Sequence, residues 1–169
     1  MSARIRILGI DPGSLTTGYG IVDVVATRTT PVSWGTVKTS GEHSERLRTI
    51  FGAISEIITE YEPMEVAVER VFVHRNADSA LKLGQARAAA ICATFGGGAA
   101  IYEYSARHIK KSVVGRGAAE KSQVQQMVKM ILGIREAVQA DAADALAAAV
   151  CHAHERGTRA LLDKQSVLA

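Results

Sequence analysis

ILGIDPGS, residues 7–14, is an apolar run that ends in one charged residue, Asp11, followed by a Pro-Gly turn. Alternate residues of a β-strand lie on the same face, so Asp11 shares a face with the apolar positions Ile7 and Gly9. An acid in that place either caps the turn that follows or binds a cation. The stretch alone permits both interpretations, and residues elsewhere in the chain must separate them.

The hydrophobic pattern on either side of this stretch predicts an α/β fold. Three strands are expected to form an antiparallel meander, followed by helices alternating with two further strands and then by helices alone. This order predicts a mixed five-stranded sheet with helices on both faces. The expected strands are 4–11, 18–25, 32–38, 65–73 and 99–105, and the expected helices are 47–61, 76–95, 124–132 and 141–156.

The chain has 169 residues, of which 47% are apolar and 22% charged, as in an ordinary globular protein. We expect one domain over residues 1–157 and a flexible tail over 158–169. No apolar run approaches the roughly 20 residues of a membrane span, and no signal peptide is apparent. Cys92 and Cys151 fall in alanine-rich helical segments and are expected to be reduced core residues. The expected location is the cytoplasm.

The formal net charge of +3 conceals an uneven distribution. Between residues 70 and 129 the only acids are Asp78, Glu103 and Glu120, whereas elsewhere acids outnumber bases. Such a basic region is typical of proteins that bind a polyanion, although a solvated basic surface is the alternative. Its basic residues are Arg70, Arg75, Lys82, Arg87, Arg107, Lys110, Lys111, Arg116, Lys121 and Lys129.

Four acids have mainly apolar or small neighbours: Asp11, Glu69, Asp141 and Asp144. Taken singly, Asp11 can be a turn cap, Asp141 a helix N-cap and Asp144 a favourable charge in the first helical turn. Glu69 is harder to explain, because a carboxylate in a buried strand needs a partner. If the first and fourth strands are neighbours, however, Asp11 and Glu69 meet near their carboxyl ends. A returning helix can add Asp141 and Asp144. Clustered carboxylates without His or Cys favour Mg²⁺ or Mn²⁺, and two such ions would suit phosphodiester hydrolysis.

Four stretches in order resemble the RuvC family of Holliday-junction resolvases, and the match extends over about residues 5–154. They are ILGIDPGSLTTGYGIV, VERVFVHRNADSALKLGQARAAA, VVGRGAAEKSQVQQMV and QADAADALAAAV. The resemblance implies an RNase H-like fold and a homodimer that makes paired, symmetric nicks in four-way junction DNA with Mg²⁺, in recombination and repair. It also implies partnership with the RuvA–RuvB branch-migration complex. By motif, its catalytic and metal-binding acids correspond to Asp11, Glu69, Asp141 and Asp144.

The same resemblance indicates DNA contacts. Lys110 and Lys121 match basic residues involved in junction binding and catalysis, and Arg107 and Lys111 belong to the same basic segment. Phe72 is expected to stack on an unpaired base, although an aromatic residue there is otherwise typical of a core edge. Arg75 receives a general role facing DNA. For the basic residues, the alternative is that they are ordinary solubilising charges on the surface.

Other functions remain open at this point. The glycine-rich stretch after Asp11 also resembles the phosphate loop of actin-like ATPases, but those proteins need a second lobe. A nuclease of ribosomal RNA processing of the YqgF type would retain the carboxylates but not the Phe72 loop or the segment AEKSQV. A junction-binding module without catalysis would not need all four acids. His152 and His154 lie two apart on a predicted helix and are therefore poorly placed to chelate one metal.

Overall fold

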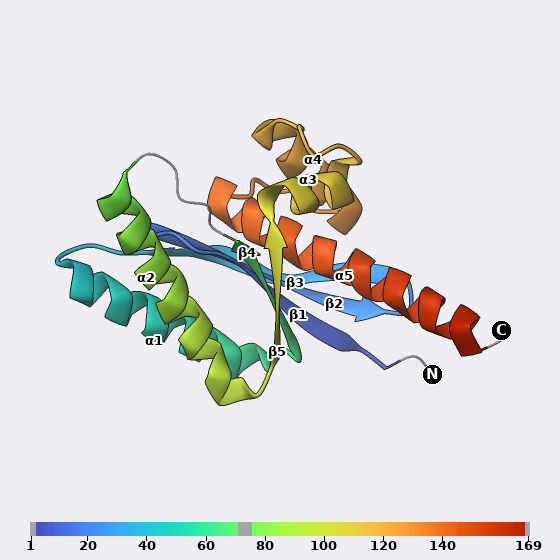
Figure 1. Ribbon diagram of the computed structural model, residues 1–169, viewed down its shortest axis with the longest axis horizontal. Helices are drawn as coiled ribbons and strands as arrows, with labels where there is room; N and C mark the ends of the chain where they lie inside the picture. The colour runs from blue at the N-terminus through green and yellow to red at the C-terminus, as the bar shows by residue number, and fades with distance from the viewer. Residues whose placement is uncertain (1–2, 71–75, 168–169) are drawn as a thin grey trace.

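The computed structural model describes residues 3–70 and 76–167, with side chains described as far as residue 158. Its centre is one sheet with strand order β3-β2-β1-β4-β5 (Figure 1). The β1–β2 and β2–β3 pairs are antiparallel, whereas β1–β4 and β4–β5 are parallel, so the predicted mixed five-stranded sheet is confirmed. The strands are β1 (Ile5–Asp11), β2 (Thr16–Val25), β3 (Arg28–Lys38), β4 (Glu65–Arg70) and β5 (Ala100–Ser105).

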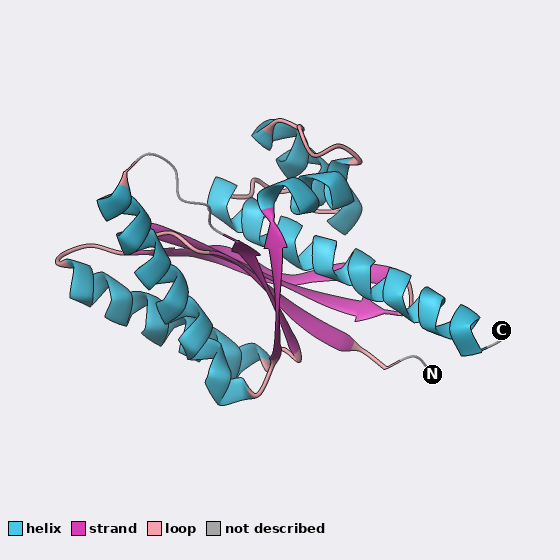
Figure 2. Ribbon diagram, viewed as in Figure 1, coloured by secondary structure: helices cyan, strands magenta, loops and turns pink. Residues whose placement is uncertain are grey.

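Helices cover both faces of the sheet, as predicted (Figure 2). One face carries α1 (His43–Tyr61) and α2 (Ala77–Thr94), which is followed by the short 3₁₀ helix η1 (Phe95–Gly97). The other carries α5 (Ala140–Val167), with α3 (Ala106–Val114) and α4 (Lys121–Leu132) packed against it. In the described part of the chain, no helix combines the length and hydrophobicity that crossing a bilayer requires.

Two sequence predictions about the helices are wrong. No helix was expected over residues 106–121, in the basic region, yet α3 occupies the first nine of these residues. Ser105 caps α3 by accepting a hydrogen bond from the His108 backbone N–H, at 3.2 Å. The last helix was expected over residues 141–156, but α5 runs from Ala140 to Val167. The expected flexibility of residues 158–169 stays a prediction.

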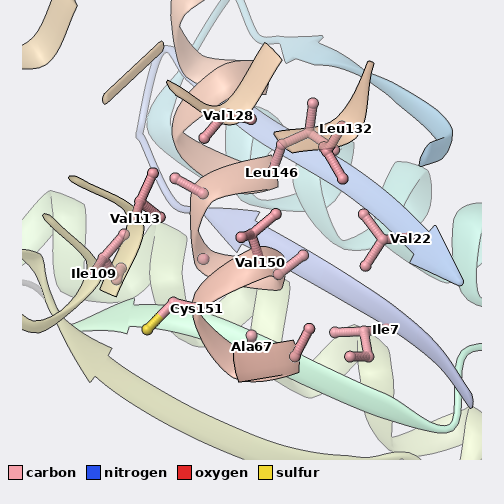
Figure 3. Packing of buried hydrophobic residues seen from close by; sticks show 14 of the residues in the cluster. Ile7, Val22, Ala67, Ile109, Val113, Val128, Leu132, Leu146, Val150 and Cys151 are labelled. Carbon is pink, nitrogen blue, oxygen red and sulfur yellow. The ribbon is translucent and has the colours of Figure 1, made fainter. Parts of the chain in front are cut away.

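Each face of the sheet has its own core. On the α5 face, Ile7, Val22 and Ala67 pack beneath α5, and α3 and α4 close the outside of this core (Figure 3). On the other face, the alternate strand residues such as Leu8 and Val66 pack against α1 and α2. Both cysteines are free. Cys151 is buried as expected, but Cys92 is exposed because it lies on the outer face of α2, so its predicted place in the core is wrong.

Glycines on β1 and β2 bring α5 unusually close to the sheet. A Cβ atom added at Gly9 would lie 2.0 Å from the Ala145 carbonyl oxygen, and one at Gly18 would lie 1.9 Å from the Asp141 carbonyl oxygen. Real Cβ atoms are not found at such distances, so only glycine permits this approach. The first turn of α5 is therefore held directly over the end of β1, where Asp11 lies.

Candidate active site

Three carboxylates meet where β1 ends and α5 begins. Asp11, Asp141 and Asp144 each offer an oxygen atom, and these atoms all lie within 4.8 Å of one another. Asp141 and Asp144 are three residues apart and share one face of α5, as the helical period requires. The predicted convergence of these three acids is confirmed. In the described part of the chain, no other group of His, Cys, Asp or Glu residues meets the same geometric test.

Glu69 approaches the cluster from the neighbouring strand. The last paired residues of β1 and β4 are Ile10 and Val68, so Asp11 and Glu69 are the next residues along two parallel strands. Both lie on the α5 face. Glu69 lines a cavity of about 250 Å³ together with Asp144. It is thus adjacent to the three clustered aspartates, although it does not belong to the group that lies within 4.8 Å.

Crowding and burial raise the proton affinity of this site. Burial is the main cause that raises the pKa of Asp11 to about 7, and repulsion from Glu69, Asp144 and Asp141 adds to it. Burial likewise raises the pKa of Glu69 and of Asp144, and each feels further repulsion from another carboxylate of the site. The ammonium group of Lys121 opposes all three shifts. The site therefore favours an added positive charge, whether protons or cations.

Two lysines supply part of that positive charge. Lys110 from α3 and Lys121 from the start of α4 line the same cavity as Glu69 and Asp144. The Nζ atom of Lys121 lies 2.5 Å from Oδ2 of Asp144. This hydrogen bond is the main cause that raises the pKa of Lys121 and keeps it charged. The packing of α3 and α4 against α5 thus brings two cations from the basic segment to the carboxylates.

The donor set fits a hard divalent cation. Oxygen atoms from several carboxylates are the ligands that Mg²⁺ and Mn²⁺ prefer, whereas zinc sites rely on His and Cys. A divalent cation would also relieve the repulsion that raises the Asp11 pKa. The three aspartates are rigidly supported because Asp11 ends a central strand and α5 rests on glycines of β1 and β2. These residues can therefore hold a metal ion without a large rearrangement.

The other predicted DNA contacts are only partly grouped. Arg107 is exposed on α3 and its side chain lies next to Gly117 in the loop that leads to α4. Lys111 is exposed too, but it lines a separate cavity of about 320 Å³ between α3 and α5. Phe72 and Arg75 lie outside the described residues, and their predicted roles stay predictions.

Sequence reasoning missed two polar clusters that hold the site's supports in place. The ring of His152 is buried, with Nδ1 2.6 Å from the Tyr104 hydroxyl and Nε2 2.8 Å from a Glu65 carboxylate oxygen, so α5 is tied to β4 and β5. On the other side of β4, Arg87 of α2 forms an ion pair with Glu103 and donates a 3.3 Å hydrogen bond to the backbone carbonyl of Glu69.

The sequence held only weak signals for these clusters. The sequence does not favour a metal site at His152, because His154 lies two residues away on the helix and cannot share its face. In the structure, the ring of His154 bonds to Ser112, at 3.2 Å. The partners of His152 are Tyr104 and Glu65, which precede it by 48 and 87 residues. Only the register between α5 and β4 reveals such a pair.

A mixed sheet of this order, with acids at adjacent strand ends and a helix that adds two more, defines an RNase H-like nuclease. The family profile described as crossover junction endodeoxyribonuclease RuvC matches residues 7–152. A protein of that description from Geobacter sp. (strain M21) is 54% identical over 158 residues, which cover 92% of this chain and 96% of that protein. The chain belongs to the RuvC family.

Solved structures agree with this assignment. The structure of T. thermophilus RuvC in complex with a Holliday junction substrate matches with a TM-score of 0.85 at 35% identity, covering 91% of this chain and 96% of that chain. The crystal structure of the yeast mitochondrial Holliday junction resolvase Ydc2 matches with a TM-score of 0.63 at 12% identity, covering 89% and 79%, and supports the fold alone. The alternatives of an actin-like ATPase and a YqgF-type nuclease are not favoured.

Proposed function

We propose that this protein is a structure-selective endonuclease that resolves four-way DNA junctions by paired symmetric nicks in homologous recombination and repair. The observation that carries the proposal is the convergence of Asp11, Asp141 and Asp144 within 4.8 Å in a chain of the RuvC family. Phosphodiester hydrolysis needs charge stabilisation at the attacking and leaving oxygens. A rigid cluster of carboxylates next to lysines provides the means to arrange that charge.

The proposed cofactor is Mg²⁺, two ions per site, with Mn²⁺ able to substitute. Asp11, Glu69, Asp141 and Asp144 would hold it. When bound, it would supply an activated water molecule and stabilise the leaving 3′ oxygen. Asp11 and Glu69 would contribute ligands from the sheet, and Asp141 and Asp144 would contribute ligands from α5. Lys110, in the same cavity, is placed to attract a phosphate toward the carboxylates.

The proposed DNA surface combines α3 and the start of α4. Arg107, Lys110, Lys111 and Lys121 would contact phosphates, which contribute affinity but no sequence information. From the family resemblance, Phe72 would stack on an unpaired base and Arg75 would face DNA. The partnership with RuvA–RuvB stays a proposal from the same resemblance.

We also propose a homodimer, because cutting two strands of a two-fold junction needs two related sites. The outer face of α2 supports this. Its exposed residues recur at helical spacing, are mostly small or apolar, and include Leu81, whose exposed fraction is 64%. A groove of about 440 Å³ follows this stripe. The stripe consists of Ala77, Leu81, Gly84, Gln85, Ala88 and Cys92.

The deciding experiment incubates the full chain with a synthetic four-way junction and Mg²⁺ and measures symmetric nicks. Asp11→Asn should reduce cleavage by at least about a hundredfold, because it removes a charged ligand at the centre of the cluster. Junction binding should survive the substitution. Glu60→Gln, which removes an exposed carboxylate on α1, is the control and should cleave normally. Absence of nicking by the unmodified protein, or full nicking by Asp11→Asn, would refute the proposal.

The dimer is tested by sedimentation. Leu81→Asp places a charge on the α2 stripe and should convert the dimer to a monomer, because a desolvated and unpaired carboxylate is costly at an interface. Met130→Asp is the matched control, since Met130 is 74% exposed on α4, away from the stripe. A monomeric unmodified protein, or a Leu81→Asp variant that stays dimeric, would contradict this interface.

A further inference from the structure

One carboxylate of the cluster is already engaged by a cation of the protein itself. Oδ2 of Asp144 lies 2.5 Å from Nζ of Lys121, and the exposed fraction of the Asp144 side chain is only 17%. A nearly buried carboxylate offers few directions of approach. The ammonium group therefore occupies one of the few approaches to the Asp144 carboxylate.

The charges around the cavity explain why a lysine is accommodated there. Asp144 and Glu69 are both acids with pKa values raised by burial, and each is stabilised in its ionised form by Lys121. An internal counter-ion lowers the repulsion between fixed carboxylates. A divalent cation would perform the same task with twice the charge. Lys121 and the cation are thus alternatives for the same electrostatic role.

The two partners differ in their freedom to move. Asp144 is fixed in the first turns of α5, where the helix lies against the glycines of the sheet. Lys121 is the first residue of α4, and the exposed fraction of its side chain is 58%. A lysine side chain has four flexible carbons, and a positive charge at a helix N-terminus is disfavoured by the helix dipole. If the pair separates, Lys121 is the partner that moves.

We propose that Lys121 competes with a divalent cation for Asp144. Cation binding releases the ammonium group, which is then available for a DNA phosphate beside the cluster. Lys121 thereby links metal occupancy to DNA binding: a phosphate that engages Lys121 favours cation binding at Asp144, and the reverse also holds by linkage. The inference rests on the divalent-metal site of the proposed function and assigns a regulatory role to one residue of that site.

The test measures Mn²⁺ binding to the full, DNA-free chain by calorimetry, with no cleavage involved. Lys121→Gln should bind Mn²⁺ about tenfold more tightly than the unmodified protein, because the competing ion pair is gone. Lys110→Gln is the sharpest comparison. Lys110 lines the same cavity with the same charge but forms no ion pair within the described part of the chain, so its removal should tighten Mn²⁺ binding by only about twofold.

Two further variants complete the design. Lys129→Gln removes a lysine from the last turn of the same helix and should leave Mn²⁺ affinity unchanged. Lys121→Arg keeps the cation and should bind Mn²⁺ as weakly as the unmodified protein. A junction added to the unmodified protein should tighten Mn²⁺ binding more than it does in Lys121→Gln, which has no competing ammonium group to release.

The outcomes separate this inference from the proposed function. If Mn²⁺ binds the unmodified protein but Lys121→Gln and Lys110→Gln show equal affinities, competition is wrong while the metal site stands. If neither the unmodified protein nor Lys121→Gln takes up Mn²⁺, the inference is wrong. If uptake is still absent with a junction bound, the metal site of the proposed function is wrong as well.

Discussion

The two faces of the sheet are built by different rules. Beneath α1, the sheet presents branched aliphatic side chains such as Leu8 and Val66, which meet an equally aliphatic helix face that includes Ile54, while the neighbouring α2 contributes mainly alanines. Beneath α5, part of the sheet presents glycine, and the residues of α5 that pack against the sheet are largely alanine. One face is a layer of large interlocking side chains, whereas on the other the backbones themselves come close.

This difference explains where the chemistry lies. Large side chains keep a helix at a distance and allow it to adjust when one of them changes. On the α5 face, the contact of Gly18 with the backbone at Asp141 leaves no such freedom. The position of α5 therefore determines the geometry of the carboxylates. We therefore expect changes in the packing of the α1–α2 face to leave Asp11, Asp141 and Asp144 in place.

The largest predicted effect comes from placing one methyl group between the two backbones. Gly9→Ala would put a Cβ atom 2.0 Å from the Ala145 carbonyl oxygen and 2.9 Å from the Ala149 nitrogen. Helix α5 must then shift away from the sheet, and we expect the free energy of unfolding to fall by about 3 kcal/mol or more. Mn²⁺ binding by the folded fraction should also weaken, because the shift carries two aspartates away from Asp11.

Urea unfolding and Mn²⁺ calorimetry check this prediction, with Ile54→Val as the control on the other face. Ile54 of α1 is fully buried against the sheet, so the loss of one methyl group should lower the free energy of unfolding by about 1 kcal/mol. Mn²⁺ affinity should not change in that variant. Equal Mn²⁺ affinities in Gly9→Ala and the unmodified protein would show that the close approach does not position the site.

The contrast between the faces also explains what the sequence could reveal. Strand periodicity and the turn after Asp11 are local signals, and they were enough to predict all five strands and a mixed sheet, although not the order of the strands in it. Because parallel strands end at a common edge, the sequence also predicted that Asp11 and Glu69 meet if the first and fourth strands are neighbours. The three-residue spacing of Asp141 and Asp144 predicted that these two acids lie on one face of the last helix. Resemblance to a family then connected these local predictions.

What the sequence did not reveal depends on contacts between distant segments. The pair formed by His152 and Glu65 needs the register of α5 on β4, and the close approach at Gly9 needs to be seen in space. The helix α3 was missed because its apolar residues, Ile109 and Val113, are few and its charges suggested an exposed loop. The ion pair of Lys121 and Asp144 likewise requires α4 to be placed against α5.

A smaller effect, this time an increase in the free energy of unfolding, should follow when the charge of Asp11 is removed from the close-packed face. Burial and three nearby carboxylates raise the pKa of Asp11 to about 7 in the folded protein. A raised folded pKa means that the folded state holds the proton more tightly than the unfolded chain. The stability that this proton provides is complete below about pH 4 and is lost as the pH rises toward 7.

Asparagine at this position cannot ionise, so it escapes this loss. In a metal chelator at pH 8, Asp11→Asn should be more stable than the unmodified protein by about 2 kcal/mol, and the difference should shrink toward pH 4. Added Mg²⁺ should stabilise the unmodified protein and have little effect on the variant. Thermal unfolding across this pH range measures both. A constant difference between the two proteins at every pH would exclude Asp11 as the titrating group.

The smallest effect should come from the same chemical change as the largest, made on the other face. Gly52 lies inside α1, and a Cβ atom added there would meet no atom within 4 Å. Alanine costs less backbone entropy in a helix than glycine, so Gly52→Ala should raise the free energy of unfolding by about 0.5–1 kcal/mol. Mn²⁺ affinity and junction cleavage should be unchanged. Urea unfolding of Gly52→Ala and Gly9→Ala compares the effect of one added methyl group at two positions. A loss of stability in Gly52→Ala would mean that the α1 face is packed as tightly as the α5 face.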